Sequence, residues 1–441
     1  MRVGLIGNGG REHALAIGLA SNPDIQLVVA AEGHNQGIAD LSAEYRNTGI
    51  KNLEKVVDYF RLHDVAFVVI GPEATLMHGV VDLLRKAGLP AVGPTQKQAR
   101  LEGDKSFMRN LLRDQVGWGS PAWETVTSLD DARKFLNDVG QIVVKPLGLT
   151  GGKGVRVMGI QLDSQDDTLA YIQQLIESDG SVLLEECVNG EEFSRMAFVS
   201  DGVLLPVPLM QDFKYAYDGD QGMMTGGMGA YSASDGSLPF VTQTDIQQAD
   251  RLLKDVVQAL ENLTAESYRG FLYGQFMVTR DGIRLIEFNV RLGDPEALNL
   301  MAVLSSDPAS LFHDIAKGTL ENNSVQFFEQ ASVSKYLVPD VYPEKLLNPL
   351  RFSFDERAAI DAGLSVIHGS VEKTGQNEWL ALGSRTLGLV GLGADPASIS
   401  DKIEAFLMRN PITGLRHRRD VGDDEIIANK IQKMKVIRDG H

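Results

Sequence analysis

The segment KPLGLTGGKGV, residues 145–155, combines two lysines with four glycines directly after the apolar run QIVV. A structural turn needs one or two glycines. A loop that closes over phosphates needs several, because its backbone N–H groups must point inward, and it needs a lysine to meet the negative charge. The composition of this segment therefore predicts a phosphate-binding loop at the end of a strand.

A second chemical signal is the stretch IEFN, residues 286–289. Glu287 and Asn289 alternate with apolar residues on a predicted strand, so both polar side chains should face the same side. Carboxylate and amide oxygens at this spacing suit a magnesium ion that is shared with the phosphates of a nucleotide. Gln275, on the neighbouring predicted strand, would face the same site as a weaker third ligand. A polar outer strand face is the alternative, and this pattern alone leaves both open.

The stretch LLEECVNGEEFS, residues 183–194, places acidic residues around a turn between two predicted strands. The strand edge from Glu185 to Val188 could offer backbone groups to an adenine, with Glu192 placed for ribose hydroxyls. Acidic residues at a turn are more often simply solvated. By composition alone, this signal is weak.

The turn GNGGREH, residues 7–13, partly matches a dinucleotide-binding fingerprint. Gly7 and Gly9 occupy its first two glycine positions, but Glu12 fills the third. A carboxylate there would repel a pyrophosphate on the helix N-terminus. Since the turn can still receive one small phosphate or polar group, another ligand is favoured over a nicotinamide or flavin dinucleotide. A purely structural turn is the remaining alternative.

The elements that must position these residues begin with about a hundred residues in which short apolar strands alternate with helical patterns. Such a rhythm predicts an open parallel sheet covered on both faces. Ligands of such sheets bind beyond the carboxyl ends of the strands, where the turns at 7–13 and 71–76 lie. From about residue 103 the predicted helices and strands no longer alternate regularly. They include two strands paired through a tight turn at Arg280-Asp281-Gly282.

Composition limits the function classes. The chain has 441 residues, enough for about three domains, and a formal charge of −17, which argues against nonspecific nucleic-acid binding. Its single cysteine, Cys187, cannot form an internal disulfide, which favours a reducing compartment. No stretch reaches about 18 consecutive apolar residues, and the N-terminus reads as a strand rather than a signal peptide. We expect a cytoplasmic protein that binds neither membrane nor nucleic acid.

Taken in order along the chain, these segments resemble the ATP-grasp fold, and more narrowly the phosphoribosylamine–glycine ligases. The motifs that carry the resemblance are GNGGREHAL, GPEATL, GPTQKQARLEGDKSF, GLTGGKGV, TGGMGAYS, RLGDPEALNL and HRRDVG, which span residues 7–422. The implied fold is α/β and α+β, with an N-terminal Rossmann-like parallel-sheet substrate domain (1–102), an ATP-grasp domain of two subdomains (103–327, lid about 118–190) and a small C-terminal α/β domain (328–441).

The resemblance implies an enzyme that uses ATP to phosphorylate the carboxylate of glycine. The amine of 5-phosphoribosylamine would then attack the glycyl phosphate and give glycinamide ribonucleotide, in the second step of de novo purine biosynthesis. ATP is the implied co-substrate, Mg2+ or Mn2+ the cofactor, and glycine and 5-phosphoribosylamine the partners of a monomer or homodimer. Phosphoryl transfer of this kind needs positioning and charge neutralisation rather than a protein nucleophile.

The resemblance also implies roles for individual residues. The ATP-binding set is Lys105, Lys145, Gly151, Gly152, Lys153, Glu185, Glu186, Val188 and Glu192. Arg291, Lys145 and Lys153 would act in catalysis, and Glu287 and Asn289, with Gln275, would bind the metal. The substrate set is Asn8, Gly9, Gly10, Glu73, Asp212, Lys214, Arg291, Asp294, Pro295 and Glu296.

The chain departs from the commoner family pattern in the 145–155 loop and at Tyr215, the pair Met223-Met224, and Val290. The methionine pair matters most, because it falls in a loop expected near the substrates. Three rivals remain at this point: another ATP-grasp carboxylate–amine ligase of purine synthesis, a nicotinamide-dependent oxidoreductase, and a non-catalytic nucleotide-binding module. The metal face at IEFN and the specific motifs TGGMGAYS and RLGDPEALNL favour the ligase.

Overall fold

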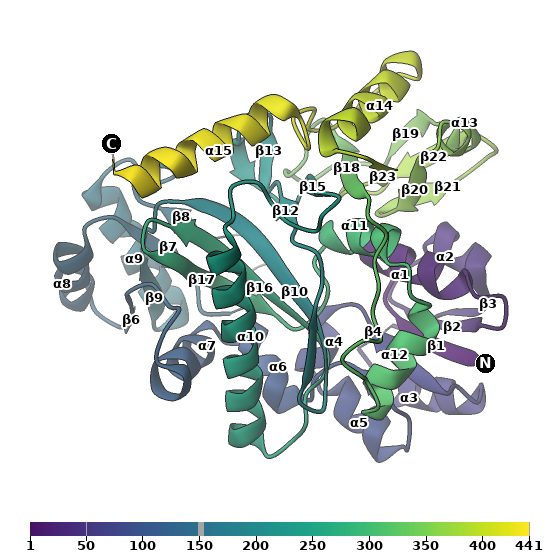
Figure 1. Cartoon of the computed structure of the whole chain (residues 1–441), viewed down its shortest axis with the longest axis horizontal. Helices are drawn as coiled ribbons and strands as arrows, with labels where there is room; N and C mark the ends of the chain where they lie inside the picture. Colours follow the sequence, from purple (N-terminus) through teal and green to yellow (C-terminus); the bar gives the residue numbers. More distant parts are fainter. Residues whose placement is uncertain (50, 149–153, 441) are drawn as a thin grey trace.

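The computed structural model describes residues 1–49, 51–148 and 154–440 (Figure 1). Three residues of the expected ATP set, Gly151, Gly152 and Lys153, therefore lie outside the described residues. Within the described part of the chain, no helix is both long and apolar enough to span a membrane.

The N-terminal segment folds into a parallel five-stranded sheet in the order β3-β2-β1-β4-β5, as the alternating pattern predicted. Its strands are β1 (Arg2–Ile6), β2 (Gln26–Ala31), β3 (Ser42–Asn47), β4 (Phe67–Ile70) and β5 (Ala91–Val92). The accompanying helices are α1 (Gly10–Ala20), α2 (Gln36–Leu41), α3 (Leu53–Leu62), α4 (Glu73–Met77) and α5 (Val80–Lys86). The inner strands are continuous apolar runs because helices cover both faces of the sheet.

The centre of the molecule is an antiparallel sheet in the order β11-β10-β16-β17. Its strands are β10 (Glu191–Ser200), β11 (Val203–Pro206), β16 (Arg269–Thr279) and β17 (Gly282–Asn289). Thr279 pairs with Gly282, so the tight turn predicted between β16 and β17 is confirmed. The helices around this sheet are α6 (Gln96–Gly103), α7 (Lys105–Leu111), the π-helical turn η1 (Leu112–Val116), α10 (Gln243–Thr264), α11 (Glu296–Val303) and α12 (Pro308–Lys317).

A smaller antiparallel sheet, in the order β6-β9-β7-β8, has a hydrophobic core of its own. It consists of β6 (Trp123–Val126), β7 (Ile142–Lys145), β8 (Arg156–Val157) and β9 (Val182–Glu186), with helices α8 (Leu129–Val139) and α9 (Gln165–Asp179). The strand that ends in Lys145 and the strand that carries Glu185 are neighbours in this sheet, with Lys145 paired to Leu183.

The C-terminal part shares its main sheet with the middle of the chain. That sheet runs β12-β15-β18-β23-β20, with β24 paired to β18. Its strands are β12 (Gln211–Asp212), β15 (Gly229–Ser232), β18 (Ala331–Pro339), β20 (Ser365–His368), β23 (Leu387–Gly393) and β24 (Leu415–Arg416). The remaining elements are the hairpin β13 (Tyr215–Tyr217) and β14 (Gln221–Met224), the sheet of β19 (Leu350–Ser353), β21 (Val371–Lys373) and β22 (Glu378–Ala381), and helices α13 (Glu356–Asp361), α14 (Pro396–Arg409) and α15 (Asp424–Asp439).

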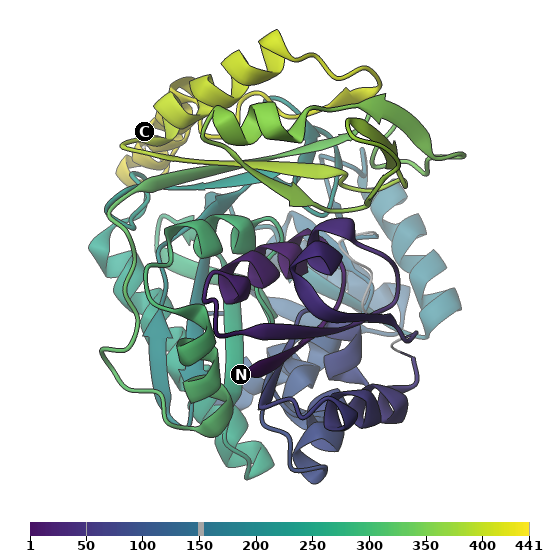
Figure 2. The ribbon, with the colours of Figure 1, turned by 90° about the vertical axis from the view of Figure 1, so that its right-hand side faces the viewer.

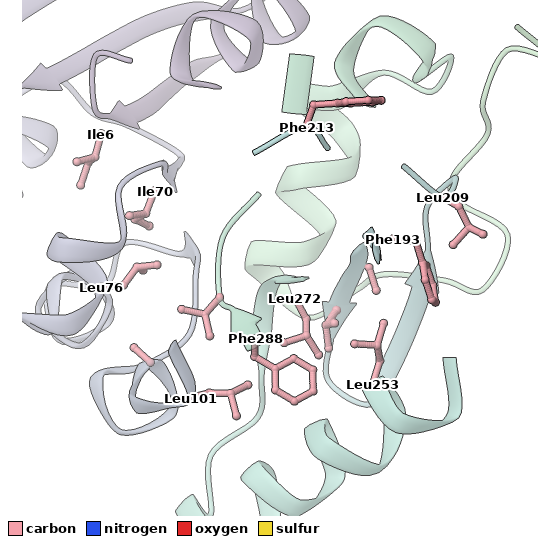
Figure 3. Close-up of a cluster of buried hydrophobic side chains, with 14 of the residues drawn as sticks. Ile6, Ile70, Leu76, Leu101, Phe193, Leu209, Phe213, Leu253, Leu272 and Phe288 are labelled. Atoms are coloured by element: carbon pink, nitrogen blue, oxygen red, sulfur yellow. The ribbon is translucent and has the colours of Figure 1, made fainter. Parts of the chain in front are cut away.

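The hydrophobic core is continuous from the N-terminal sheet into the central sheet. In Figure 3, Ile6, Ile70 and Leu76 of the N-terminal segment lie on one side of Phe288, and Phe193 of β10 lies on the other. Figure 2 shows the C-terminal elements stacked across the N-terminal and central parts. Because buried apolar surface joins these layers, the edges of the sheets that carry the polar residues are held in fixed relative positions.

One polar contact between the two ends of the chain is made by His13 of α1. Its Nδ1 accepts a hydrogen bond from the backbone N–H of His368 at 2.7 Å, and the two rings lie 4.8 Å apart. His13 thus acts as a hydrogen-bond acceptor, and its partner lies 355 residues away in the sequence. Burial, with the nearby His368 adding to it, lowers the pKa of His13 to about 3.

This buried histidine makes folding sensitive to acid. His13 stays neutral in the folded state, whereas in the unfolded chain it binds a proton below about pH 6.5. The stability that depends on neutral His13 is therefore present above that pH and lost as the pH falls. We expect the unfolding free energy of His13→Gln to fall less steeply than that of the wild type between about pH 6.5 and pH 4. Urea denaturation at several pH values measures this; parallel curves for the two proteins would contradict it.

Candidate ATP and substrate site

Three polar side chains gather at the end of β17. Asn289 Nδ2 lies 3.5 Å from Glu287 Oε1, and Arg291 Nη2 donates to Asn289 Oδ1 at 3.0 Å. Glu287 and Asn289 lie on one face of β17, as strand alternation requires, and Arg291 follows two residues beyond the end of the strand. The side chains that the sequence expected to bind metal and phosphate are therefore adjacent.

Arg291 also faces two carboxylates of the N-terminal part of the chain. Its Nη2 lies 3.2 Å from Glu102 Oε1 and its Nε lies 3.7 Å from Glu73 Oε2. Burial alone would lower the pKa of Arg291, but Glu102 and Glu73 outweigh it and raise the pKa above its ordinary value. The buried Nε has no hydrogen-bond partner among the described residues. A permanently charged guanidinium with a spare donor is suited to an anionic group.

Glu102 is a site residue that the analysis of the sequence did not single out. It lies within GPTQKQARLEGDKSF, three residues before Lys105, and besides Arg291 it accepts the backbone N–H of Val290 at 2.8 Å. Burial raises the pKa of Glu102, although Arg291 opposes the shift. Val290, one of the departures from the family pattern, is buried in the core. Its side chain therefore fills space directly after β17, the strand that carries Glu287 and Asn289.

Two lysines lie on the other side of Glu287. Lys145 Nζ forms an ion pair with Glu185 Oε2 at 2.7 Å and donates to the carbonyl of Ile286 at 3.3 Å. Lys105 Nζ donates to the carbonyls of Pro146 and Gly148, at 2.9 and 2.7 Å. Burial lowers the pKa of Lys105. The positive charge of Lys145 lowers this pKa further, whereas the negative charge of Glu287 opposes the shift. Lys105 thus holds the start of the glycine-rich segment, and both lysines lie within reach of one site.

The fully buried Arg109 connects these residues and was not predicted. From α7, it donates to both carboxylate oxygens of Glu185, at 2.7 and 2.8 Å, and to the carbonyls of Leu285 and Ile286, at 3.1 and 2.9 Å. Burial alone would raise the pKa of Glu185, but Arg109 and Lys145 hold it below its ordinary value. The Glu185 side chain therefore ties the small sheet to the strand of Glu287.

The expected adenine edge follows Glu185. The backbone N–H of Glu186 donates to the carbonyl of Ala122 at 2.8 Å, and that of Cys187 donates to Gln141 at 2.9 Å. Val188 belongs to the short connection between β9 and β10, so it lies where the small sheet joins the central one. Burial raises the pKa of the Cys187 thiol, which disfavours the thiolate and therefore a role as a nucleophile.

A second polar group lies at the start of β10. Glu192 Oε2 accepts from Lys214 Nζ at 2.7 Å and from Gln275 Nε2 at 2.9 Å, and Lys214 also lies 3.2 Å from Asp212. Burial, opposed by Lys214, raises the pKa of Asp212 to about 7, with Glu296 and Glu192 adding to it. Burial alone would lower the pKa of Lys214. The charges of Asp212 and Glu192 outweigh this effect, so the pKa of Lys214 is raised.

Gln275 is directly paired with Glu287 in the β16–β17 register. Its amide oxygen accepts from the hydroxyls of Ser194 and Tyr273, while its amide nitrogen faces Glu192 and Asp212. Rotation of the amide by half a turn would instead present the oxygen toward the carboxylates and any cation between them. Its position next to Glu287 agrees with the expected location of a third ligand.

The turn at residues 7–13 is closed by its own glutamate. Gly9 N–H donates to Glu12 Oε2 at 2.6 Å, which caps the first turn of α1. A Cβ on Gly71 would lie 2.1 Å from Glu12 Oε1, and one on Gly7 would lie 2.6 Å from Glu12 Cγ. Glu12 thus occupies the place where a dinucleotide pyrophosphate would approach the helix, which argues against the oxidoreductase interpretation.

Two neighbouring residues that the sequence predicted to contact substrate, Asn8 and Gly10, are held by contacts with other parts of the chain. A Cβ on Gly10 would lie 2.0 Å from the hydroxyl of Tyr336, so only glycine permits this approach. The carbonyl of Asn8 accepts from Asn35 Nδ2 at 3.0 Å. Gly10 is therefore buried against β18 of the C-terminal part, and Asn8 is joined to that part through Asn35, whose Nδ2 also donates to the carbonyl of His368 at 2.9 Å.

The corner Asp294-Pro295-Glu296 begins α11. The Asp294 carboxylate accepts hydrogen bonds from Tyr336 Oη at 2.7 Å and from Arg385 Nη2 at 2.8 Å. The other terminal nitrogen of Arg385, Nη1, donates to the carbonyl of Gly226 at 2.5 Å. Glu296, buried, accepts from the hydroxyls of Tyr273 and Ser194 at 2.8 and 3.0 Å. Arg385 joins this corner to the TGGMG loop; it lies outside the motifs that carried the resemblance and was not predicted.

The methionine pair lies on the hairpin β13–β14, where Met224 is paired with Tyr215. Met223 is 54% exposed, so its side chain fills no cavity. Thr225, which follows the pair, donates from its N–H to the carbonyl of Lys214 at 2.7 Å. The methionine pair therefore lies on the outer edge of a hairpin whose end is hydrogen-bonded to the backbone of Lys214.

No group of three or more histidine, cysteine or acidic side chains forms a ready metal cage in the portion of the chain that the structure describes. Mg2+ bound with ATP does not require one, because it takes one or two protein ligands and completes its shell with water and phosphate oxygens. One carboxylate and one amide oxygen, next to two lysines and an arginine, have the right chemistry for a metal shared with phosphates. The donor set therefore fits a magnesium–nucleotide pair.

Comparison with known proteins identifies the family. The family model described as phosphoribosylglycinamide synthetase, N domain, matches residues 1–102, and that described as phosphoribosylglycinamide synthetase, ATP-grasp (A) domain, matches residues 103–297. Phosphoribosylamine–glycine ligase of Pyrococcus abyssi is 38% identical over 438 residues, covering 99% of this chain and 98% of that protein. The Methanosarcina barkeri protein of the same name is 40% identical over 443 residues, covering 99% of this chain and all of that protein.

Solved structures agree with this assignment. A phosphoribosylamine–glycine ligase of Thermotoga maritima superposes with a TM-score of 0.76 at 25% identity, over 96% of this chain and 100% of that one. The biotin carboxylase domain of the Hydrogenobacter thermophilus 2-oxoglutarate carboxylase, solved with MgADP, gives a TM-score of 0.70 at 15% identity, over 100% and 95%, and shares the fold alone. The expected fold class is confirmed, and the chain belongs to the phosphoribosylamine–glycine ligase family of ATP-grasp enzymes.

Proposed function

We propose that this chain ligates glycine to 5-phosphoribosylamine, forming glycinamide ribonucleotide with conversion of ATP to ADP and phosphate. The observation that carries the proposal is the convergence of Lys145, Glu287, Asn289 and Arg291 at one edge of the central sheet. Cations beside hard oxygen ligands meet the requirements of phosphoryl transfer, in which charge must be neutralised and reactants aligned. Membership of the ligase family supports the choice of substrates.

On the nucleotide side, Lys105 and Lys145 would bind the phosphates of ATP, and residues 148–154, with Lys153, would cover them. Backbone groups of Glu186 and Val188 would meet the adenine, and Glu192 the ribose. Glu287 and Asn289, with Gln275 beside them, would hold Mg2+, which supplies positive charge to the phosphate oxygens when it is bound. The nature of the metal, Mg2+ or Mn2+, is part of this proposal.

On the substrate side, Arg291 would bind the acyl phosphate, because its Nε is buried without a partner among the described residues. Asp212 and Lys214 place opposite charges side by side, which matches the ammonium and carboxylate groups of glycine. 5-Phosphoribosylamine would lie between Asn8 to Gly10, Glu73 and the corner Asp294 to Glu296. We also propose the bounds 1–102, 103–327 and 328–441 for the three domains.

Phosphate release from ATP with magnesium tests the proposal directly. Glycine alone, 5-phosphoribosylamine alone and both together should be compared, and release is expected only with both, together with glycinamide ribonucleotide by mass spectrometry. Release with another amino acid would keep the fold and mechanism but assign a change of substrate to Met223 and Met224. ATP binding without release for any pair would contradict the ligase and favour a nucleotide-binding module.

A further inference from the structure

The C-terminal helix α15 is attached to the first residue of β10. Lys430 Nζ lies 2.9 Å from Glu191 Oε2, and Lys433 Nζ lies 2.7 Å from Glu191 Oε1. Lys433 also donates to the carbonyl of Gly190 at 2.8 Å. Both carboxylate oxygens of Glu191, a side chain only 8% exposed, are therefore held by one helix.

Glu191 is adjacent in sequence to the expected ribose ligand. Successive residues of a strand point to opposite faces, and accordingly Glu191 faces α15 while Glu192 faces Lys214 and Gln275. Whatever fixes the position of Glu191 therefore also fixes the position of Glu192. The lysines of α15 act on the opposite side of the strand from the site.

The connection between the small sheet and the central sheet ends at the same point. Residues 187–190 join β9 to β10, and they contain the expected adenine contact Val188. Gly190 lies so close to β16 that a Cβ would stand 1.9 Å from the carbonyl of Val278. The backbone here is therefore held from one side by β16 and from the other by Lys433.

The helix has independent anchors that keep it in place. Met434 is buried in the main core, and at the far end Arg438 Nη2 pairs with Asp245 of α10 at 2.5 Å. Figure 1 shows α15 lying across the edge of the molecule next to β13. Because these contacts do not involve Glu191, removal of the lysine charges should leave the helix docked.

We infer that Lys430 and Lys433 are positioning residues for ATP, which preform the adenine edge and Glu192 by fixing Glu191 and Gly190. This rests on the proposed function for the identity of the ligand. Lys430 should contribute more than Lys433, because its side chain is 11% exposed and that of Lys433 is 49% exposed. The double loss would leave a buried carboxylate at Glu191 without its partners, which displaces the strand end.

The test compares K430M, K433M and the double variant with K435M, a matched control at an exposed position of the same helix. The double variant is expected to raise both the KM for ATP and the dissociation constant of MgATP about tenfold. We expect kcat and the KM for glycine to stay close to wild type, and the thermal midpoint to fall because the buried Glu191 carboxylate loses its partners. K430R should restore both ATP binding and the thermal midpoint. Calorimetric titration with MgATP supplies the binding constant without turnover.

The outcomes separate this inference from the proposed function. An unchanged ATP affinity in the double variant, or the same effect from K435M, would overturn the inference. A loss of kcat and a rise in the KM for glycine as large as the change in ATP affinity would also overturn it, since this would indicate a structural role alone. If the wild type binds MgATP but forms no glycinamide ribonucleotide, the proposed function fails while the titration still decides the inference.

Discussion

Replacement of Lys145 by methionine is expected to lower kcat/KM for ATP by about a hundred- to a thousandfold, the range seen when one preorganised charge-stabilising donor is removed. The ammonium group lies at the end of β7, 8% exposed, between Glu185 and the carbonyl before Glu287. Methionine has a similar length but no charge. The loss should therefore fall on phosphate binding and transfer rather than on packing.

The fold should survive this change, because Glu185 keeps both of its hydrogen bonds to Arg109. Steady-state kinetics with ATP as the varied substrate measure kcat/KM, and thermal unfolding tests whether the fold is intact. K97M is the control, since the Lys97 side chain is 68% exposed and its ion pair, at 3.2 Å, is with Glu266, away from the site. If K145M kept half or more of the wild-type kcat/KM for ATP, the assignment of Lys145 to the ATP site would be wrong.

The second large effect is expected at Glu287. Glu287→Gln keeps the shape of the side chain but removes the charge of the one carboxylate in the expected metal pair. We expect the Mg2+ concentration for half-maximal activity to rise at least about tenfold, the lower end of losses seen at perturbed metal sites, and kcat to fall with it. A magnesium titration at fixed, saturating ATP gives the result.

The control for Glu287→Gln is Asp281→Asn, in the exposed turn of the same hairpin. It removes one negative charge from the same pair of strands without touching the site. A magnesium titration of E287Q that superposes on that of Asp281→Asn would disprove the metal assignment. A large change in both variants would indicate a general effect of charge.

Local regularities made much of the site predictable. Strand alternation is a local property, so IEFN by itself predicted Glu287 and Asn289 on one face, and the predicted hairpin made Gln275 a neighbour of this segment. A β-bulge after Gln275 sets its pairing with Glu287, which the turn alone does not give. Continuous apolar strands separated by helices likewise required a parallel sheet covered on both sides. These features depend on residues close together in the sequence.

The partners of the buried charges could not be predicted in this way. Arg109 meets Glu185 from 76 residues away, and Arg385 meets Asp294 from 91 residues away. A buried ion pair is fixed by the position of both elements, and composition gives no sign of which of many carboxylates a given arginine will meet. The same reason hid the role of Glu102 beside Arg291.

The sequence by itself determined the residue types, the strands that carry them and, through its motifs, the family. Only the tertiary structure decided that two strands from the middle of the chain, β12 and β15, complete the C-terminal sheet, and that α15 returns to hold Glu191. The physical reason is that periodicity is a local property, whereas burial of the charged and apolar surfaces of each element depends on every other element.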